Sequence, residues 1–204
     1  MKDEVTRIYE RLLVVRCQAG DQAALGELIA RYSPGLRFFL RRLSSQAETA
    51  DDLLQETWID VYRKINRLQR PDAFTAWLYR IARDKAYREL RRPTSRCVRI
   101  DENLADSIVS EEVSFTAEEA ENVRAALDQL PLEQRDVLVL RFMEEMSYEQ
   151  IAEVIARPVG TVRSRLYYAK LALRAKLELT TNAKETLYER ERTEQGITAR
   201  RRSD

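Results

Sequence analysis

The sequence contains no histidine, and its two cysteines, Cys17 and Cys97, lie far apart without a CxxC pair. Because histidine and cysteine are the main protein ligands of zinc, no zinc site is expected. The missing histidine also removes the commonest general base and every Ser-His or Cys-His nucleophile arrangement. We therefore expect a protein that is not an enzyme, has no metal or cofactor and keeps its cysteines reduced in the cytoplasm, although carboxylate chemistry stays open on these grounds alone.

Glycine and proline are scarce too, with five of each in 204 residues, and apolar and polar residues nowhere alternate strictly. Both features favour helices over a sheet, so we expect an all-α protein. No apolar run approaches the roughly 18 residues that a membrane span needs. The N-terminal stretch carries acids instead of an apolar signal core, so neither membrane insertion nor export is expected.

The net charge of +1 hides a strong asymmetry along the chain. Residues 1–96 hold 19 Lys and Arg against 13 Asp and Glu, whereas residues 97–126 hold 2 against 8. Further along, residues 157–176 contain six basic residues and no acid. Two basic blocks that flank an acidic one predict contacts with nucleic acid at two separate places.

Apolar residues at steps of three and four predict a helical domain over residues 1–92. Its first clear helix follows Asp21, the expected N-cap. A second apolar stripe runs over residues 54–68, and a third helix follows a turn, with Asp72 as its expected N-cap. These helices are expected to form one compact bundle.

Residues 93–122 show acids, Ser and Thr without a sustained period, which predicts a flexible acidic linker. Periodicity returns over residues 123–179, the expected second helical domain. There, residues 147–150 match the S-x-x-Q capping box, and Arg157-Pro158 interrupts the short helix that follows. A short helix, a tight turn and a basic helix predict a helix-turn-helix. The polar tail, residues 180–204, is expected to extend the last helix and then fray.

The basic helix of this helix-turn-helix carries residue types that contact DNA. Val162 and Leu166 are four residues apart and face inward, which leaves polar side chains on the outer surface. Arginine can donate two hydrogen bonds to the edge of one guanine base, and threonine and serine can form hydrogen bonds with phosphates or bases. A solvated basic helix in a small bundle would show the same pattern, so these residues alone leave both interpretations open.

This part of the chain resembles region 4 of extracytoplasmic-function (ECF) sigma factors, which reads the −35 promoter element. The run PVGTVRSRL, residues 158–166, is the most specific part, because it combines the turn, the helix start and the reading face. The resemblance implies that Arg163 and Ser164 face the −35 bases. Thr161 and Arg165 are implied to lie nearer the DNA backbone. The implied −35 surface comprises Thr161, Arg163, Ser164, Arg165, Tyr167, Tyr168 and Lys170.

The chain departs from this family at two positions of the motif. Ala156 stands where glycine is common, and costs up to about 1 kcal/mol if the backbone there is left-handed. Tyr168 stands where arginine is common, so one DNA contact of the family is in question.

The run DDLLQETWIDVYRKI resembles sigma region 2.2, the helix that docks on the clamp coiled coil of the largest polymerase subunit. Asp52, Gln55 and Glu56 share one polar face, where their carboxylates and amide could meet arginines of a partner helix. The implied polymerase-binding surface comprises Asp52, Gln55, Glu56 and Trp58. Without the resemblance, an ordinary solvated acidic face would be the favoured interpretation.

The run FTAWLYRIARDKAYRELRR resembles sigma regions 2.3 and 2.4, which open and hold the −10 element, and the loop before it resembles the specificity loop of the family. Strand opening needs stacking surfaces for unpaired bases and cations for the strand backbone. The implied −10 surface comprises Asn66, Arg67, Phe74, Trp77, Tyr79, Arg80, Arg83, Lys85 and Arg88. The spacing of Trp77 to Phe74 and Ile81 favours a core position for Trp77 itself. Asp84 stands where asparagine is common in the family.

Together the two resemblances identify the chain as similar to an ECF sigma factor of the sigma-70 family. They cover residues 20–92 and 127–178, and the gap is too short for the additional helical domain of primary sigma factors. The resemblance implies binding to the clamp coiled coil and flap of core RNA polymerase, recognition of −10 and −35 elements in promoter DNA, and transcription initiation. It also allows an anti-sigma factor as a partner.

Two other classes of protein remain as alternatives. A stand-alone helix-turn-helix regulator would need a dimer interface and a palindromic site, whereas this chain offers two different DNA-facing units. An interaction protein of the anti-sigma type would explain the helices but not the basic block over residues 157–176.

Overall fold

The computed structural model describes residues 4–44, 46–91 and 116–200, with side chains except at residues 117–118 and 180–200. Within these ranges the regular elements are all helices, which confirms the all-α prediction. They form two units, which we call the N-terminal unit (up to residue 91) and the C-terminal unit (from residue 116). No described helix combines the length and apolar character that crossing a membrane requires.

The N-terminal unit is a bundle built on amphipathic helices. It contains α1 (Glu4–Gln18), α2 (Gln22–Leu43), α3 (Ala47–Lys64), η1 (Ile65–Arg67), η2 (Pro71–Ala73) and α4 (Phe74–Leu90), where η marks a 3-10 turn. Helix α2 packs against α1, α3 and α4, and its buried face includes Leu28 and Phe39. The rings of Phe39 and Tyr79 meet edge to face with their centroids 5.3 Å apart. The apolar repeat of three and four residues therefore gives the bundle that the sequence predicts.

The two N-caps predicted in this unit have different outcomes. Asp21 caps α2 as expected, because its Oδ1 accepts hydrogen bonds from the backbone N–H of Ala23 (2.9 Å) and Ala24 (3.2 Å). The N-cap prediction for Asp72 is wrong, because Pro71 starts a 3-10 turn that runs directly into α4. Asp72 lies inside that turn, and its Oδ1 forms an ion pair with Nε of Arg11 at 3.1 Å.

The C-terminal unit contains α5 (Ala117–Asp128), α6 (Leu132–Phe142), α7 (Tyr148–Ile155) and α8 (Val159–Arg200). Helix α5 begins six residues before the predicted start of periodicity at residue 123. Thr116 and Glu119 form a capping box there, with Glu119 Oε2 accepting from the Thr116 backbone N–H at 2.8 Å. This T-x-x-E signal is visible in the sequence, but the predicted helix start did not include it. The predicted linker up to residue 115 lies outside the described residues.

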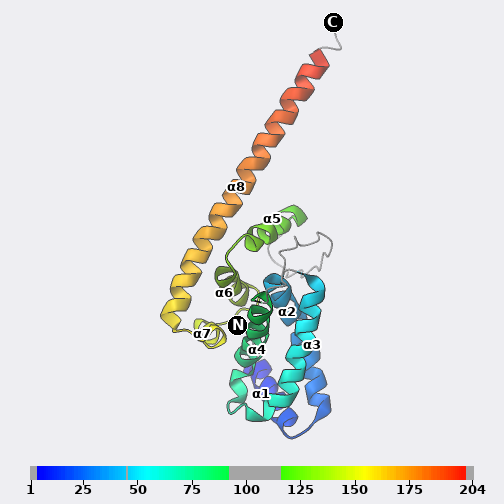
Figure 1. Ribbon diagram of the computed structural model, residues 1–204, viewed down its shortest axis with the longest axis vertical. Coiled ribbons are helices and arrows are strands. Elements are labelled where there is room, and N and C mark those ends of the chain that lie inside the picture. Colours follow the sequence, from blue (N-terminus) through cyan, green and yellow to red (C-terminus); the bar gives the residue numbers. More distant parts are fainter. Residues whose placement is uncertain (1–3, 45, 92–115, 201–204) are drawn as a thin grey trace.

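Helices α7 and α8 form the predicted helix-turn-helix. Ser147 and Gln150 make the capping box at the start of α7, as predicted. Ala156 ends the helix in the left-handed conformation, with φ 51° and ψ 49°. Helix α8 packs on α5, α6 and α7 and then continues to Arg200, and its C-terminal part projects away from the other helices (Figure 1), as expected for a tail that extends the last helix.

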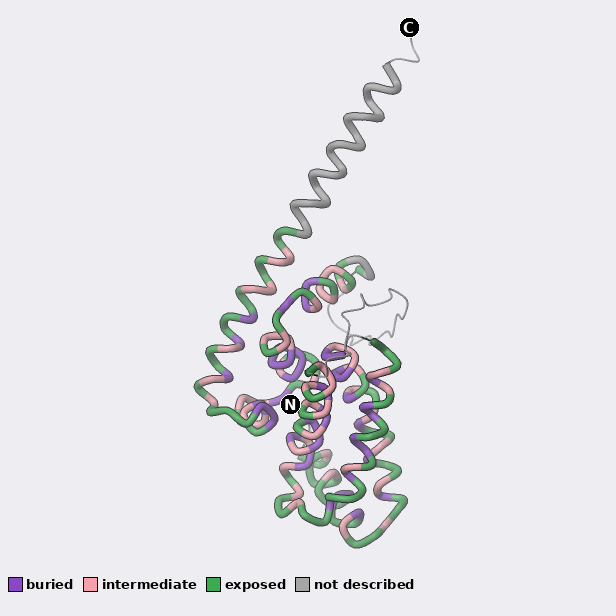
Figure 2. The backbone as a smooth tube through the Cα atoms, in the orientation of Figure 1, coloured by how far each residue is buried: buried purple, intermediate pink, exposed green. Residues whose placement is uncertain are grey.

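The two units share one continuous hydrophobic core. Helix α4 packs on α7, and α2 packs on α6. Figure 2 shows that buried residues occur along helices of both units. The sequence predicts two domains with a linker, but it does not predict this direct contact between them.

Candidate functional site

Helix α3 presents the predicted polymerase-binding residues on an open face. Asp52, Gln55 and Glu56 are all exposed. Trp58, predicted for the same surface, is only 8% exposed and lies in the core, where its Nε1 donates to Ser33 Oγ at 3.1 Å. Trp58 therefore supports the helix from behind, and the open face consists of the three polar side chains.

Two apolar residues that the sequence did not predict for this surface extend it. Ile59 and Tyr62 are 48% and 63% exposed, and they follow Asp52 and Gln55 by seven residues each. Residues seven apart lie on the same side of a helix, so the polar face continues into an apolar one. Tyr62 falls within the apolar stripe read from the sequence, which made it look inward-facing.

A charged cluster ties α3 to α4 next to this face. Lys85 Nζ lies 3.1 Å from Glu56 Oε2 and 3.1 Å from Asp60 Oδ2, and its side chain is only 12% exposed. Burial raises the pKa of Asp60, but Lys85 and Lys64 outweigh it and hold that pKa below its usual value. Lys85, predicted to contact −10 DNA, is thus held between the two helices.

The other predicted −10 residues divide into exposed and covered groups. The exposed ones are Asn66, Arg67, Arg80 and Arg88. Phe74 is buried, and its ring meets that of Tyr32 edge to face. Trp77 is half-buried and packs against the core with its ring centroid 6.1 Å from that of Phe74. The core position favoured for Trp77 by its spacing is therefore only partly realised.

Two predicted −10 residues face the C-terminal unit instead of solvent. Tyr79 is 1% exposed, and its hydroxyl donates to Glu144. Arg83 donates from Nε to Asp136 Oδ2 at 2.7 Å, and Tyr87 donates its hydroxyl to the same oxygen at 2.7 Å. The Arg83 guanidinium also stacks on the Tyr87 ring, 4.0 Å from its centroid.

Asp136 of α6 is the acceptor at the centre of this contact, and it is 0% exposed. Burial raises the pKa of Asp136, and Arg83 and Tyr87 act against that shift. Its second oxygen, Oδ1, is buried without a hydrogen-bond partner. A buried carboxylate with one oxygen left without a hydrogen-bond partner is unusual in a folded protein.

The start of α8 presents the predicted −35 surface openly. Val162 and Leu166 are buried, as predicted from their spacing. The exposed members of the surface are Arg163, Ser164, Tyr167, Tyr168 and Lys170. Thr161 is half-buried, and Arg165 forms an ion pair with Glu133 at 2.9 Å. The helix therefore offers cations and hydroxyl groups on one outer face, as a DNA-reading helix requires.

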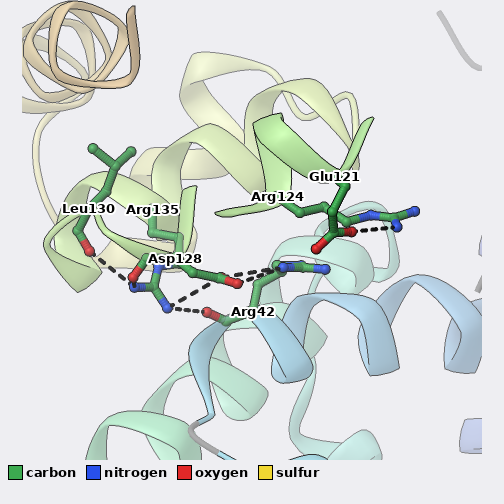
Figure 3. A network of polar contacts seen from close by, with 6 residues as sticks. All are labelled: Arg42, Glu121, Arg124, Asp128, Leu130 and Arg135. Carbon is green, nitrogen blue, oxygen red and sulfur yellow. Dashed lines mark hydrogen bonds and ion pairs between the residues drawn. The ribbon is translucent and has the colours of Figure 1, made fainter. Parts of the chain in front are cut away.

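A second set of polar contacts between the units was not predicted (Figure 3). Arg42 at the end of α2 reaches Asp128 at the end of α5, with Nη1 and Oδ2 3.1 Å apart. Arg135 donates from Nη1 to the backbone oxygen of Arg42 at 2.9 Å and from Nη2 to that of Leu130 at 3.1 Å. Burial lowers the pKa of Arg135 from its usual value. Arg42 lies 86 residues from Asp128 and 93 residues from Arg135 in the sequence, so no local pattern could have indicated its contacts with them.

Comparison with known families matches both units. The model for sigma-70 region 2 matches residues 28–96, and the model for sigma-70 region 4 matches residues 120–173. The RNA polymerase sigma-H factor of Pseudomonas aeruginosa is 35% identical over 181 residues, which cover 83% of this chain and 94% of the relative. The ECF RNA polymerase sigma-E factor of Haemophilus influenzae is 32% identical over 184 residues, covering 84% of this chain and 97% of the relative.

Two solved structures resemble the fold. CnrH in complex with the cytosolic domain of CnrY has a TM-score of 0.64 at 26% identity, and the match covers 83% of this chain and 97% of that one. The sigma factor RpoE in complex with the anti-sigma factor NepR from Bartonella quintana has a TM-score of 0.61 at 25% identity, with 75% and 96% covered.

Proposed function

Because the chain belongs to the sigma-70 family, as an RNA polymerase sigma factor of the ECF class, we propose that it directs core polymerase through three separate surfaces. The general function, transcription initiation, follows from the family. The assignment of surfaces to partners is our proposal. The observation that carries it is that an open acidic face on α3 and an open basic face on α8 lie on different units.

The polymerase-binding surface is the exposed face of α3 formed by Asp52, Gln55 and Glu56, continued by Ile59 and Tyr62. Its carboxylates and amide suit arginines of a partner helix, here the clamp coiled coil of the largest polymerase subunit. Exposed Ile59 and Tyr62 add apolar area, and tyrosine is enriched where partners bind.

The −10 element is held by the N-terminal unit and the −35 element is read by α8. Arg80 and Arg88 supply exposed cations, and the half-buried Trp77 supplies aromatic surface for a base. On α8, Arg163 and Ser164 face the bases, and Lys170 neutralises phosphate. Each half binds weakly until polymerase fixes the spacing between the two units.

The partners are core polymerase, including the flap for the C-terminal unit, and promoter DNA. An anti-sigma factor is a further partner, supported by the structural relative solved with the anti-sigma factor NepR. The protein works in the cytoplasm, where polymerase is, and carries no catalytic activity of its own. A stand-alone regulator is the less favoured alternative, because both units match sigma-70 regions.

Run-off transcription with bacterial core polymerase and a pool of selected promoters tests this function. We expect specific start sites that disappear in a Gln55→Ala/Glu56→Ala variant, with activity at least tenfold lower, because the polymerase-binding face is lost. A Gln22→Ala/Glu27→Ala variant removes the same exposed residue types from α2 and should keep full activity. If the protein instead binds duplex DNA tightly and no template is transcribed, the stand-alone regulator is the better explanation.

A further inference from the structure

The segment that joins α3 to α4, residues 65–73, contains the loop whose sequence resembles the specificity loop of the family, and we call it the α3–α4 loop. It consists of the turns η1 and η2 and the residues between them. Its exposed polar side chains are Asn66, Arg67, Gln69, Arg70 and Asp72. Asn66 and Arg67 belong to the predicted −10 surface. To discriminate between bases, such side chains need a backbone that holds them in one arrangement.

Gln18, the last residue of α1, reaches the α3–α4 loop from 47 and 50 residues away in the sequence. Its Nε2 donates to the backbone oxygen of Ile65 at 2.9 Å and to that of Leu68 at 2.8 Å. One amide nitrogen can do both, because it carries two N–H groups. Ile65 and Leu68 flank Asn66 and Arg67, so a single side chain holds the backbone on both sides of the residues predicted to contact DNA.

The end of α1 fixes where the Gln18 side chain points. Val14, four residues earlier, and Cys17, directly before it, are both buried, so Gln18 lies on the inner side of the helix. The helix closes just beyond it, where the backbone N–H of Gly20 donates to Cys17 O at 3.0 Å. Gly20 has a φ of 92°, which glycine adopts without a Cβ penalty. The half-buried Gln18 amide is thus aimed at the loop by its own helix.

We propose that Gln18 is a positioning residue for recognition of the −10 element. By holding the carbonyl groups of Ile65 and Leu68, it keeps the α3–α4 loop in the conformation in which Asn66 and Arg67 discriminate between bases. Gln18 acts through the loop and does not itself contact DNA. The proposal rests on the proposed function, because it takes this loop as part of the −10 surface. Gln18 precedes residues 28–96, which match sigma-70 region 2, so that match does not include it.

The other contacts of the loop do not replace these two hydrogen bonds. The Ile65 side chain is buried and that of Leu68 packs against the core, but apolar packing has no direction and leaves the orientation of a carbonyl group open. Arg11 and Asp72 form an ion pair at 3.1 Å near the other end of the loop, yet their side chains are 58% and 49% exposed. Such an exposed pair contributes little. Gln18 therefore supplies the directional contact.

A loop that is ordered before it meets DNA discriminates better than a mobile one. It loses less conformational entropy on binding, and it cannot relax around a wrong base to recover lost contacts. Removing the Gln18 hydrogen bonds is therefore expected to weaken discrimination at the −10 element. The −35 surface lies on α8 of the other unit, so discrimination at the −35 element is expected to stay the same.

Two variants remove the donors of Gln18 in different ways. Gln18→Met keeps the length of the side chain but cannot donate a hydrogen bond, and Gln18→Glu keeps the shape but places carboxylate oxygens against two carbonyl oxygens. Gln134→Met is the matched control, because it makes the same substitution at another half-buried glutamine, on α6 of the C-terminal unit.

The main measurement is run-off transcription by the holoenzyme from a barcoded pool of templates that vary in either the −10 or the −35 bases. For both Gln18 variants, we expect the preference for the best −10 base to fall roughly tenfold, the discrimination that one well-placed base contact supplies. The −35 preference should stay unchanged, and Gln134→Met should match the wild type. Amide hydrogen exchange of the free protein is a second readout, and residues 65–70 should exchange faster in both Gln18 variants.

The outcomes separate the role of Gln18 from the function on which it rests. If the wild type starts transcription at specific sites and either Gln18 variant keeps its −10 preference, the positioning role is overturned and the proposed function stands. Equal losses of preference at −10 and −35 would show that Gln18 supports the fold in general, which also overturns the positioning role. If the wild type itself gives no specific start sites with core polymerase, the proposed function fails, and the positioning role fails with it.

Discussion

Ala156 carries a backbone conformation that alanine adopts only at a cost. It ends α7 with φ 51° and ψ 49°, where glycine has no Cβ penalty. We expect Ala156→Gly to raise the free energy of unfolding by about 1 kcal/mol. Urea denaturation measures the change. Ala30→Gly, at an exposed site inside α2, is the control and should lower stability by about 1 kcal/mol. A loss of stability in Ala156→Gly would contradict this account.

At the scale of single residues, the sequence predicts whether a side chain points inward or outward better than it predicts which residue that side chain contacts. The spacing of Val162 and Leu166 gives their burial correctly, because helical phase is a local property. Trp58 was assigned to a surface by resemblance, yet it fills the core. The partner of Arg83 could not be predicted, because Asp136 lies 53 residues away in the sequence.

Asp21, between α1 and α2, is both the N-cap of α2 and a titrating group. The hydrogen bond from the Arg16 side chain is the main reason that the pKa of Asp21 lies below its usual value. The hydrogen bond from the backbone N–H of Ala24 lowers that pKa further. Because the pKa of Asp21 is lower in the folded protein than in the unfolded chain, the ionised carboxylate stabilises the fold at pH values above about 4. That contribution is lost as the pH falls through the lowered pKa.

Asp21→Asn tests this pH dependence, because asparagine also caps helices but does not titrate. We expect the wild type to be more stable than Asp21→Asn near neutral pH, and the difference to shrink as the pH falls below about 4. Urea denaturation of both proteins at a series of pH values measures it. A difference that stays constant with pH would show that the charge of Asp21 contributes nothing.

At the scale of elements, predictions succeed where a signal lies within four residues. The capping box of Ser147 and Gln150 sets the start of α7 by local hydrogen bonds alone. The Asp72 prediction failed because a preceding 3-10 turn moved the helix start, and turn type is not visible from one acidic residue. The capping box at Thr116, which was not predicted, obeys the same local rule as the one at Ser147.

At the scale of the molecule, the two domains could be predicted, but their contact could not. Each domain follows from apolar periodicity and from runs that resemble known regions. The contact depends on pairs such as Arg42 with Asp128 and Arg83 with Asp136, which come from opposite sides of the predicted linker. A single sequence holds no periodic signal for such pairs, so only a structure reveals that the units share one core.

That shared core makes the unfolding of the whole molecule cooperative. Because apolar residues of both units form one cluster, we expect the wild type to melt in a single calorimetric transition. Removing one partner of a buried ion pair costs about 3–5 kcal/mol, so Asp136→Ala should uncouple the units and give two transitions. Glu121→Ala, which breaks an exposed pair within α5, should keep one. If the wild type already melts in two steps, the contact between the units does not couple them, and α4 and α6 fold independently of one another.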